Sequence, residues 1–244
     1  MPQPPTPSMV YDIIEASAQP GCPLCRVSDR WGGRFMASIL YEEVTDPHSR
    51  NRLKASFGFC GEHAWQATEV GGTLLGMSII YRGLLAQIST ALNHSAPAEK
   101  KRWWQGRSER TESDAMADAG IAPREPCPAC LYLRDMERAA LVAVVENLSG
   151  NERLRTALSQ PQSGFCLPHL RTALAVATDP AAHRFLQETT QARLNELIAE
   201  MDEFIRKYDH RFRKEEWGAE RDSWQRAIAW VAGGLVDDHS APVD

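Results

Sequence analysis

The sequence predicts an all-α protein built from two homologous helical lobes, each with a Cys3His metal site at helix N-termini. Three observations predict this class. A motif of cysteines and histidine occurs twice, apolar residues recur at helical spacing after each copy, and no convincing alternating strand pattern is present. We therefore expect an internal duplication in which each copy folds around its own metal ligands.

The six cysteines all belong to the repeated motif, which reads CPxC, then a gap of roughly 33 residues, then GFCxxH. Three thiolates and one imidazole form a ligand set of structural zinc, and the two-residue gap in CPxC lets both cysteines reach one ion. We assign the ligands within each copy. The first predicted site is Cys22, Cys25, Cys60 and His63, and the second is Cys127, Cys130, Cys166 and His169.

Three alternative roles for the cysteines fit the sequence less well than metal binding does. Disulfides are disfavoured because the N-terminal segment shows no secretion signal. A thioredoxin-like role is expected within a βαβ pattern, which is missing, and it leaves the GFCxxH segments unexplained. Inert buried thiols do not account for a third cysteine and a histidine at matched positions.

Each copy is expected to contain three helices. Proline directly after the first cysteine favours a helix opening at each CPxC, because the first helical position does not need the missing N–H. The GFCxxH segments are expected to open helices over 64–70 and 170–177, so the ligands lie at helix N-termini, where the macrodipole lowers thiolate pKa values. A long helix then closes each copy, with apolar stripes Met77, Ile80, Leu84, Ile88, Leu92 and Leu194, Leu197, Met201, Phe204, Tyr208.

The expected organisation follows from these elements. It comprises a disordered lead over 1–10, a first helical metal-binding repeat over 11–94, a charged linker over 95–123, a second repeat over 124–210, and a C-terminal helix and tail over 211–244. Within the tail, a helix is expected from about Glu220 to Val231. Trp103 and Trp104 stand out in the polar linker, because large indoles dock on their own protein or on a partner.

Composition restricts the classes of function. With 244 residues, 43% hydrophobic and 24% charged, the chain is typical of a soluble globular protein. A net charge of -5 speaks against nucleic-acid binding as the main activity. The most apolar stretch, Leu74 to Ile88, is interrupted by Gly76, Arg82 and Gly83, so we expect no membrane span and a cytoplasmic location.

The motifs GCPLC, YEEVTDPHSRNRLKASFGFCGEH, PCPAC and GFCLPHL resemble those of an uncharacterised bacterial family classed as a domain of unknown function. The resemblance covers both copies and leaves out the linker and the last 30 or so residues. It implies a helical, metal-binding protein with the eight ligands named above. It implies no biochemical activity.

Two zinc ions are the favoured cofactors, because a Cys3His set saturates a tetrahedral ion and leaves no open position for a substrate. Two iron–sulfur clusters, and hence electron transfer, are the main alternative, and a thiol-based redox sensor is a third. No phosphate loop, GxSxG or HExxH motif is present, so the sequence favours a non-catalytic binding, assembly or regulatory factor. The expected partner is another protein, bound through Trp103, Trp104 or the C-terminal helix.

Overall fold

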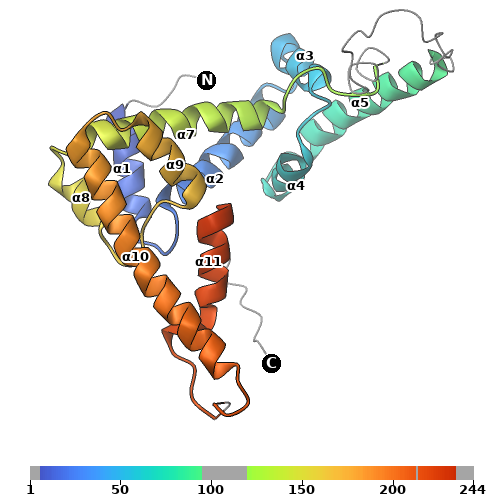
Figure 1. Ribbon diagram of the computed structural model, residues 1–244. Helices are drawn as coiled ribbons and strands as arrows, with labels where there is room; N and C mark the ends of the chain where they lie inside the picture. The colour runs from blue at the N-terminus through green and yellow to red at the C-terminus, as the bar shows by residue number, and fades with distance from the viewer. Residues whose placement is uncertain (1–5, 95–119, 213, 235–244) are drawn as a thin grey trace, which may run out of the picture. The chain divides into compact units, whose positions relative to one another are not determined.

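The computed structural model of the protein describes residues 6–94, 120–212 and 214–234, and helices make up the regular structure of these residues (Figure 1). No strand occurs in the described ranges, where one isolated parallel bridge joins Gly21 to Ser163. The all-α class is therefore confirmed. The helices are α1 (Thr6–Ala16), α2 (Pro23–Ala37), the π-helix η1 (Ser38–Glu42), α3 (Pro47–Ala55), α4 (Gly61–Glu69), α5 (Leu74–His94), α7 (Pro128–Asn147), α8 (Glu152–Leu158), α9 (Leu167–Val176), α10 (Pro180–Lys207), the 3-10 helix η2 (Ala219–Asp222) and α11 (Ser223–Ala232).

The chain forms two compact units that do not follow the order of the sequence. Unit 1 contains Met1–Arg30 and Asp135–Asp244, and unit 2 contains Trp31–Arg134. The predicted lobes over 11–94 and 124–210 do not match these units. The reason lies in α2 and α7, which begin in one unit and end in the other, so each unit takes one part of both helices.

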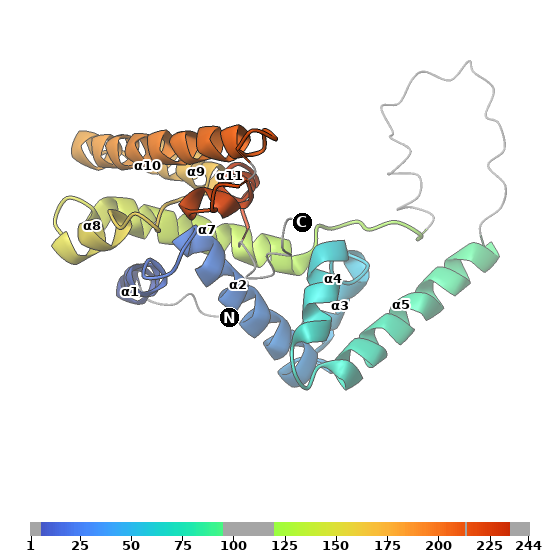
Figure 2. The ribbon, with the colours of Figure 1, turned by 90° about the horizontal axis from the view of Figure 1, so that it is seen from below.

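Unit 1 has its core around α7. Its fully buried side chains include Ile13 of α1, Leu24 of α2, Met136, Leu141 and Val144 of α7, and Leu154 of α8. Helix α1 packs on α8, and α9 lies beside α10 and α11 (Figure 2). Because α1 begins at Thr6 and buries Met9 and Val10, the expected disordered lead is wrong for residues 6–10.

Unit 2 has a separate core to which α2, η1, α3, α4, α5 and the start of α7 contribute. Its buried members include Phe35, Leu40, Leu53, Phe59 and Leu84. The rings of Phe35 in α2 and Tyr132 in α7 are stacked, with centroids 4.4 Å apart. This pair joins the CPxC helices of both sequence halves inside unit 2.

Helix α5 contributes to the core of unit 2 through its N-terminal half, and both views show its other end extending past α3 and α4 (Figures 1 and 2). Ile80 and Leu84 are buried, whereas Leu85 and Leu92 are exposed. Over Leu74–Asn93 the helix is long and apolar enough to cross a membrane by length and composition, with 17% of the most apolar window buried. The interruptions at Gly76, Arg82 and Gly83 therefore do not keep α5 below this length and apolarity, and the absence of a membrane span stays a prediction.

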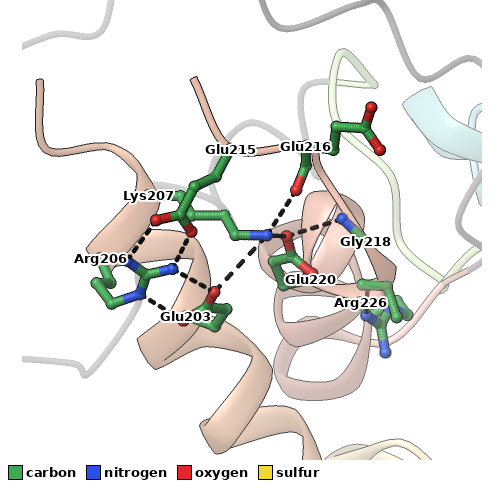
Figure 3. Close-up of polar contacts among 9 residues, drawn as sticks. Glu203, Arg206, Lys207, Glu215, Glu216, Gly218, Glu220 and Arg226 are labelled. Atoms are coloured by element: carbon green, nitrogen blue, oxygen red, sulfur yellow. Dashed lines mark hydrogen bonds and ion pairs between the residues drawn. The ribbon is translucent and has the colours of Figure 1, made fainter. Parts of the chain in front are cut away.

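Helix α11 is tied to the end of α10 by a network of ion pairs (Figure 3). Lys207 Nζ lies 2.5 Å from Glu220 Oε1, and the Glu220 carboxylate also accepts the Gly218 N–H at 2.8 Å. Arg226 in α11 pairs with Glu200 in α10. The predicted C-terminal helix is thus present, beginning as η2 at Ala219 and continuing as α11 to Ala232.

The expected linker lies mostly outside the described residues. Trp103 and Trp104 are among the residues that the structure does not describe. The predicted docking of these indoles on a surface therefore stays a prediction.

Candidate metal centres

The eight predicted ligands form two clusters, but the clusters combine the two halves of the sequence. Centre 1 consists of Cys22, Cys25, Cys166 and His169, and centre 2 consists of Cys60, His63, Cys127 and Cys130. Each CPxC pair meets the GFCxxH pair of the other half. The assignment of Cys22 and Cys25 with Cys60 and His63, and of Cys127 and Cys130 with Cys166 and His169, is therefore wrong.

Backbone hydrogen bonds just before the ligands hold this crossed arrangement. In unit 1, the Gly21 N–H, next to Cys22, donates to the Gln162 carbonyl at 2.9 Å, shortly before Cys166. In unit 2, the Arg124 N–H donates to the Ala55 carbonyl at 2.8 Å. Each CPxC segment is thus bonded to the chain that leads into the GFCxxH segment of the other half.

The ligands lie at helix N-termini, as predicted. Helices α2 and α7 begin at the prolines that follow Cys22 and Cys127, and Cys60 and Cys166 are the N-cap residues of α4 and α9. Free N–H groups and the positive end of each helix macrodipole therefore face the sulfur atoms. This arrangement offsets the charge of three thiolates.

The ligand atoms of centre 1 converge closely. His169 Nδ1 lies 3.3 Å from Cys22 Sγ, 3.5 Å from Cys25 Sγ and 3.2 Å from Cys166 Sγ. The Sγ atoms of Cys25 and Cys166 are 3.6 Å apart. All four ligand atoms lie within 4.8 Å of one another.

Centre 2 has the same arrangement. His63 Nδ1 lies 3.1 Å from Cys60 Sγ, 3.8 Å from Cys127 Sγ and 3.3 Å from Cys130 Sγ. The Sγ atoms of Cys60 and Cys130 are 3.7 Å apart. Its four ligand atoms also lie within 4.8 Å of one another.

These separations fit four ligands around a single ion. With zinc–sulfur bonds of about 2.3 Å, the edge of a regular tetrahedron measures about 3.8 Å between sulfur atoms. The observed sulfur separations of 3.6 and 3.7 Å are close to this edge. They are too long for a disulfide, whose sulfur atoms are about 2.05 Å apart, and all six cysteines are free.

The ligands of centre 1 have pKa values that are shifted in opposite directions. Burial raises the pKa of Cys22 well above its ordinary value, and hydrogen bonds to Cys166 and Cys25 act in the same direction. Hydrogen bonds from Cys22, Cys25 and His169 lower the pKa of Cys166. Desolvation opposes charge on His169, but contacts with Cys166, Cys25 and Glu137 outweigh it and raise its pKa to about 11. A divalent cation bound here would displace the remaining protons.

Glu137 and Ser28 support centre 1, and neither was predicted from the sequence. Glu137 in α7 places its Oε2 atom 3.6 Å from His169 Nε2, on the ring edge opposite the sulfur atoms. The Ser28 hydroxyl in turn donates to Glu137 Oε1 at 2.5 Å. A carboxylate on the far nitrogen of a ligating histidine fixes its tautomer and orientation. The sequence did hold one indication of this role. Glu137 stands seven residues after Cys130, which places it on the same face of α7 as that ligand.

The end of α11 also lies against centre 1. The Gly234 N–H donates to Cys25 Sγ at 3.4 Å. A Cβ atom on Gly233 would lie 3.7 Å from Cys166 Sγ, and the φ of +82° at Gly233 favours glycine. Nothing in the C-terminal sequence indicated this contact, because two glycines after a helix are ordinary stop signals.

Centre 2 is more open to solvent than centre 1. Cys130 is exposed and Cys60 is half-buried, while His63 and Cys127 are buried. In centre 1, Cys22 and Cys166 are buried, and the His169 side chain is 12% exposed. Partial burial and a hydrogen bond to Cys60 raise the pKa of Cys130 to about 12.

Comparisons with known proteins give a family and no activity. A family model described as "Family of unknown function (DUF6062)" matches residues 9–238. The chain is also similar to an "Uncharacterized 23.9 kDa protein in xynA 3'region" from Caldicellulosiruptor sp. (strain Rt8B.4), with 23% identity over 223 residues, which cover 91% of this chain and 99% of the relative. No solved structure matches the chain.

Proposed function

We propose that this chain, which belongs to the family of unknown function DUF6062, is a non-catalytic protein that binds two zinc ions and acts as a binding, assembly or regulatory factor. One observation carries the proposal: in each centre, three sulfur atoms and one imidazole nitrogen lie within 4.8 Å of one another. A Cys3His set of this size fills the four positions of a tetrahedral ion. Such a site stabilises a fold and leaves no position for a substrate.

The same separations favour a single ion over an iron–sulfur cluster in each centre. A cluster distributes its protein ligands over different iron atoms, with inorganic sulfide between them. Ligands that all converge on one point suit a single ion instead. Electron transfer through two clusters therefore has less support than two zinc ions.

A role in binding is supported by apolar side chains on the surface of each unit. Trp65 of α4 is 76% exposed in unit 2. In unit 1, Ile228 and Val231 of α11 are exposed, although the rest of this helix packs on α9 and α10. Exposed apolar groups of this kind suit contact with another protein. We propose a reducing cytoplasm as the location, because all six cysteines are free.

Metal analysis of the purified protein tests the proposal. Protein prepared anaerobically, without added metal, is expected to be colourless and to contain about two zinc ions per chain. Cobalt(II) exchanged into both centres is expected to give the absorption of tetrahedral thiolate coordination. A brown protein containing iron and acid-labile sulfide would contradict the proposal and favour electron transfer.

A further inference from the structure

The two centres have the same ligands, but the residues around the ligands differ. In unit 1, Ser28 of α2 contacts Glu137 of α7. These residues stand three positions after Cys25 and seven positions after Cys130. The matching positions in unit 2 are Leu133, three after Cys130, and Gly32, seven after Cys25.

The matching positions in unit 2 also meet, but without a carboxylate. A Cβ atom on Gly32 would lie 3.4 Å from Leu133 Cδ1 and 3.7 Å from Gln66 Oε1, so the neutral side chains of Leu133 and Gln66 border this position. Gly32 has no side chain with which to hold His63. The carboxylate that faces His169 therefore has no counterpart at the equivalent position of centre 2.

A second difference is the cover over the sulfur atoms. In centre 1, the Gly234 N–H donates to Cys25 Sγ, and Gly233 lies against Cys166. A hydrogen bond to a ligand sulfur and close contact with the chain limit access by water and competing ligands. In centre 2, Cys130 is exposed to solvent.

We propose that the two centres hold zinc unequally: Glu137 and the end of α11 retain the ion of centre 1, whereas centre 2 exchanges its ion with solvent. Glu137 acts as a positioning residue through His169, and Gly234 acts through Cys25. Centre 1 is then a permanent part of the fold, and centre 2 is the place where metal supply or competing thiols regulate the protein. This inference rests on the proposed zinc binding.

Zinc release from the full-length protein to a chromogenic chelator measures the difference. We expect two kinetic phases, each of about one ion per chain. Brief alkylation with iodoacetamide during release, followed by peptide mass spectrometry, assigns each phase to a centre. We expect Cys60, Cys127 and Cys130 to be modified in the fast phase, while Cys22, Cys25 and Cys166 stay protected until the slow phase.

The Glu137→Gln variant tests the positioning role directly. Loss of a carboxylate behind a ligating histidine typically weakens metal binding by about 10- to 100-fold, so the slow phase is expected to accelerate within that range while the fast phase is unchanged. Glu146→Gln is the matched control, because Glu146 lies on the exposed part of the same helix. Gly234→Pro removes the N–H donor to Cys25 and cannot keep the φ of +100° at this position, so it displaces the chain after α11 from centre 1 and is expected to accelerate the same phase as Glu137→Gln.

The outcomes separate this inference from the proposed function. Protein that binds no zinc would overturn both. Protein that binds two ions and releases them at one rate, or modifies Cys22, Cys25 and Cys166 first, would overturn the unequal retention alone. So would a Glu137→Gln variant whose release matches that of Glu146→Gln.

Discussion

Gly76, near the start of α5, shows how closely backbones meet in unit 2. A Cβ atom at this position would lie 1.9 Å from the carbonyl oxygen of Leu40, in the π-helix η1. The obstacle is backbone, which cannot move aside as a flexible side chain would. Gly76 therefore sets the distance between α5 and η1, and with it the packing of Ile80 and Leu84 in the core.

Gly76→Ala is expected to lower the free energy of unfolding of unit 2 by about 1–3 kcal/mol or more, because overpacking forces the two backbones apart. Gly83→Ala in the same helix is the control. Its Cβ atom would meet nothing within 4 Å, and alanine favours helix by about 0.5–1 kcal/mol. Urea unfolding of zinc-loaded protein measures both free energies. Equal values for the two variants would show that the approach to Leu40 does not limit the packing.

The role of a single residue could be predicted from the sequence where that residue belongs to a repeated motif. The eight ligands stand in two copies of one spacing, so their chemistry could be inferred without the fold. Glu137 could not be found this way, because a glutamate on a helix is commonly a solvated side chain. Its role depends on His169, which comes from α9 and lies beside it only in the folded unit.

Among the elements, the helices that begin at ligands were predicted best. Proline after the first cysteine and glycine before the third mark the starts of α2, α7, α4 and α9. The start of helix α1 was missed, because a disordered lead was expected over residues 1–10, whereas burial of Met9, Val10 and Ile13 stabilises the helix from Thr6. Tertiary packing outweighed local sequence there.

The pairing of α10 with α11 depends on Glu220 and Lys207, which are both largely buried. The Gly218 N–H and Lys207 lower the pKa of Glu220 to about 2, below the ordinary carboxyl value. A carboxylate with a lowered pKa contributes stability above its unfolded pKa and loses it as the pH falls towards the folded value. The contribution of Glu220 is therefore complete at neutral pH.

Glu220→Gln is expected to loosen α11 at neutral pH, because it leaves Lys207 without its closest carboxylate. Hydrogen exchange of the α11 amides should become faster, and the protection of α1 and α8 should stay unchanged. Asp222→Asn is the control, since Asp222 is 52% exposed and pairs with Arg226 at the surface. Unchanged exchange in Glu220→Gln would contradict the role of this pair in holding α11.

At the scale of the whole molecule, each centre connects the two halves of the sequence. The two CPxC motifs and the two GFCxxH motifs are interchangeable by spacing, so nothing in the sequence distinguished crossed from uncrossed pairing. The crossing follows the division of the chain into units. Helix α2 begins in unit 1 and ends in unit 2, and α7 does the reverse, so the GFCxxH segment after each helix contributes to the core of the other unit.

The two sequence copies are compatible with an internal duplication, and the crossed centres show how such copies depend on each other. Unit 1 needs Cys22 and Cys25 from the first half, and unit 2 needs Cys127 and Cys130 from the second. Neither half contains a complete centre. Metal binding and folding of the two halves are therefore expected to be coupled.

Cysteine protection in Cys22→Ser tests this crossed arrangement most directly. Zinc-loaded variant protein is treated briefly with iodoacetamide, and the modified cysteines are identified by peptide mass spectrometry, with the parent protein treated identically. We predict that Cys25 and Cys166 become strongly modified relative to the parent, while Cys60, Cys127 and Cys130 react as they do in the parent. Modification of Cys60 that rises above the parent level, with Cys166 as protected as in the parent, would contradict the account, because the ligands would then pair within each half.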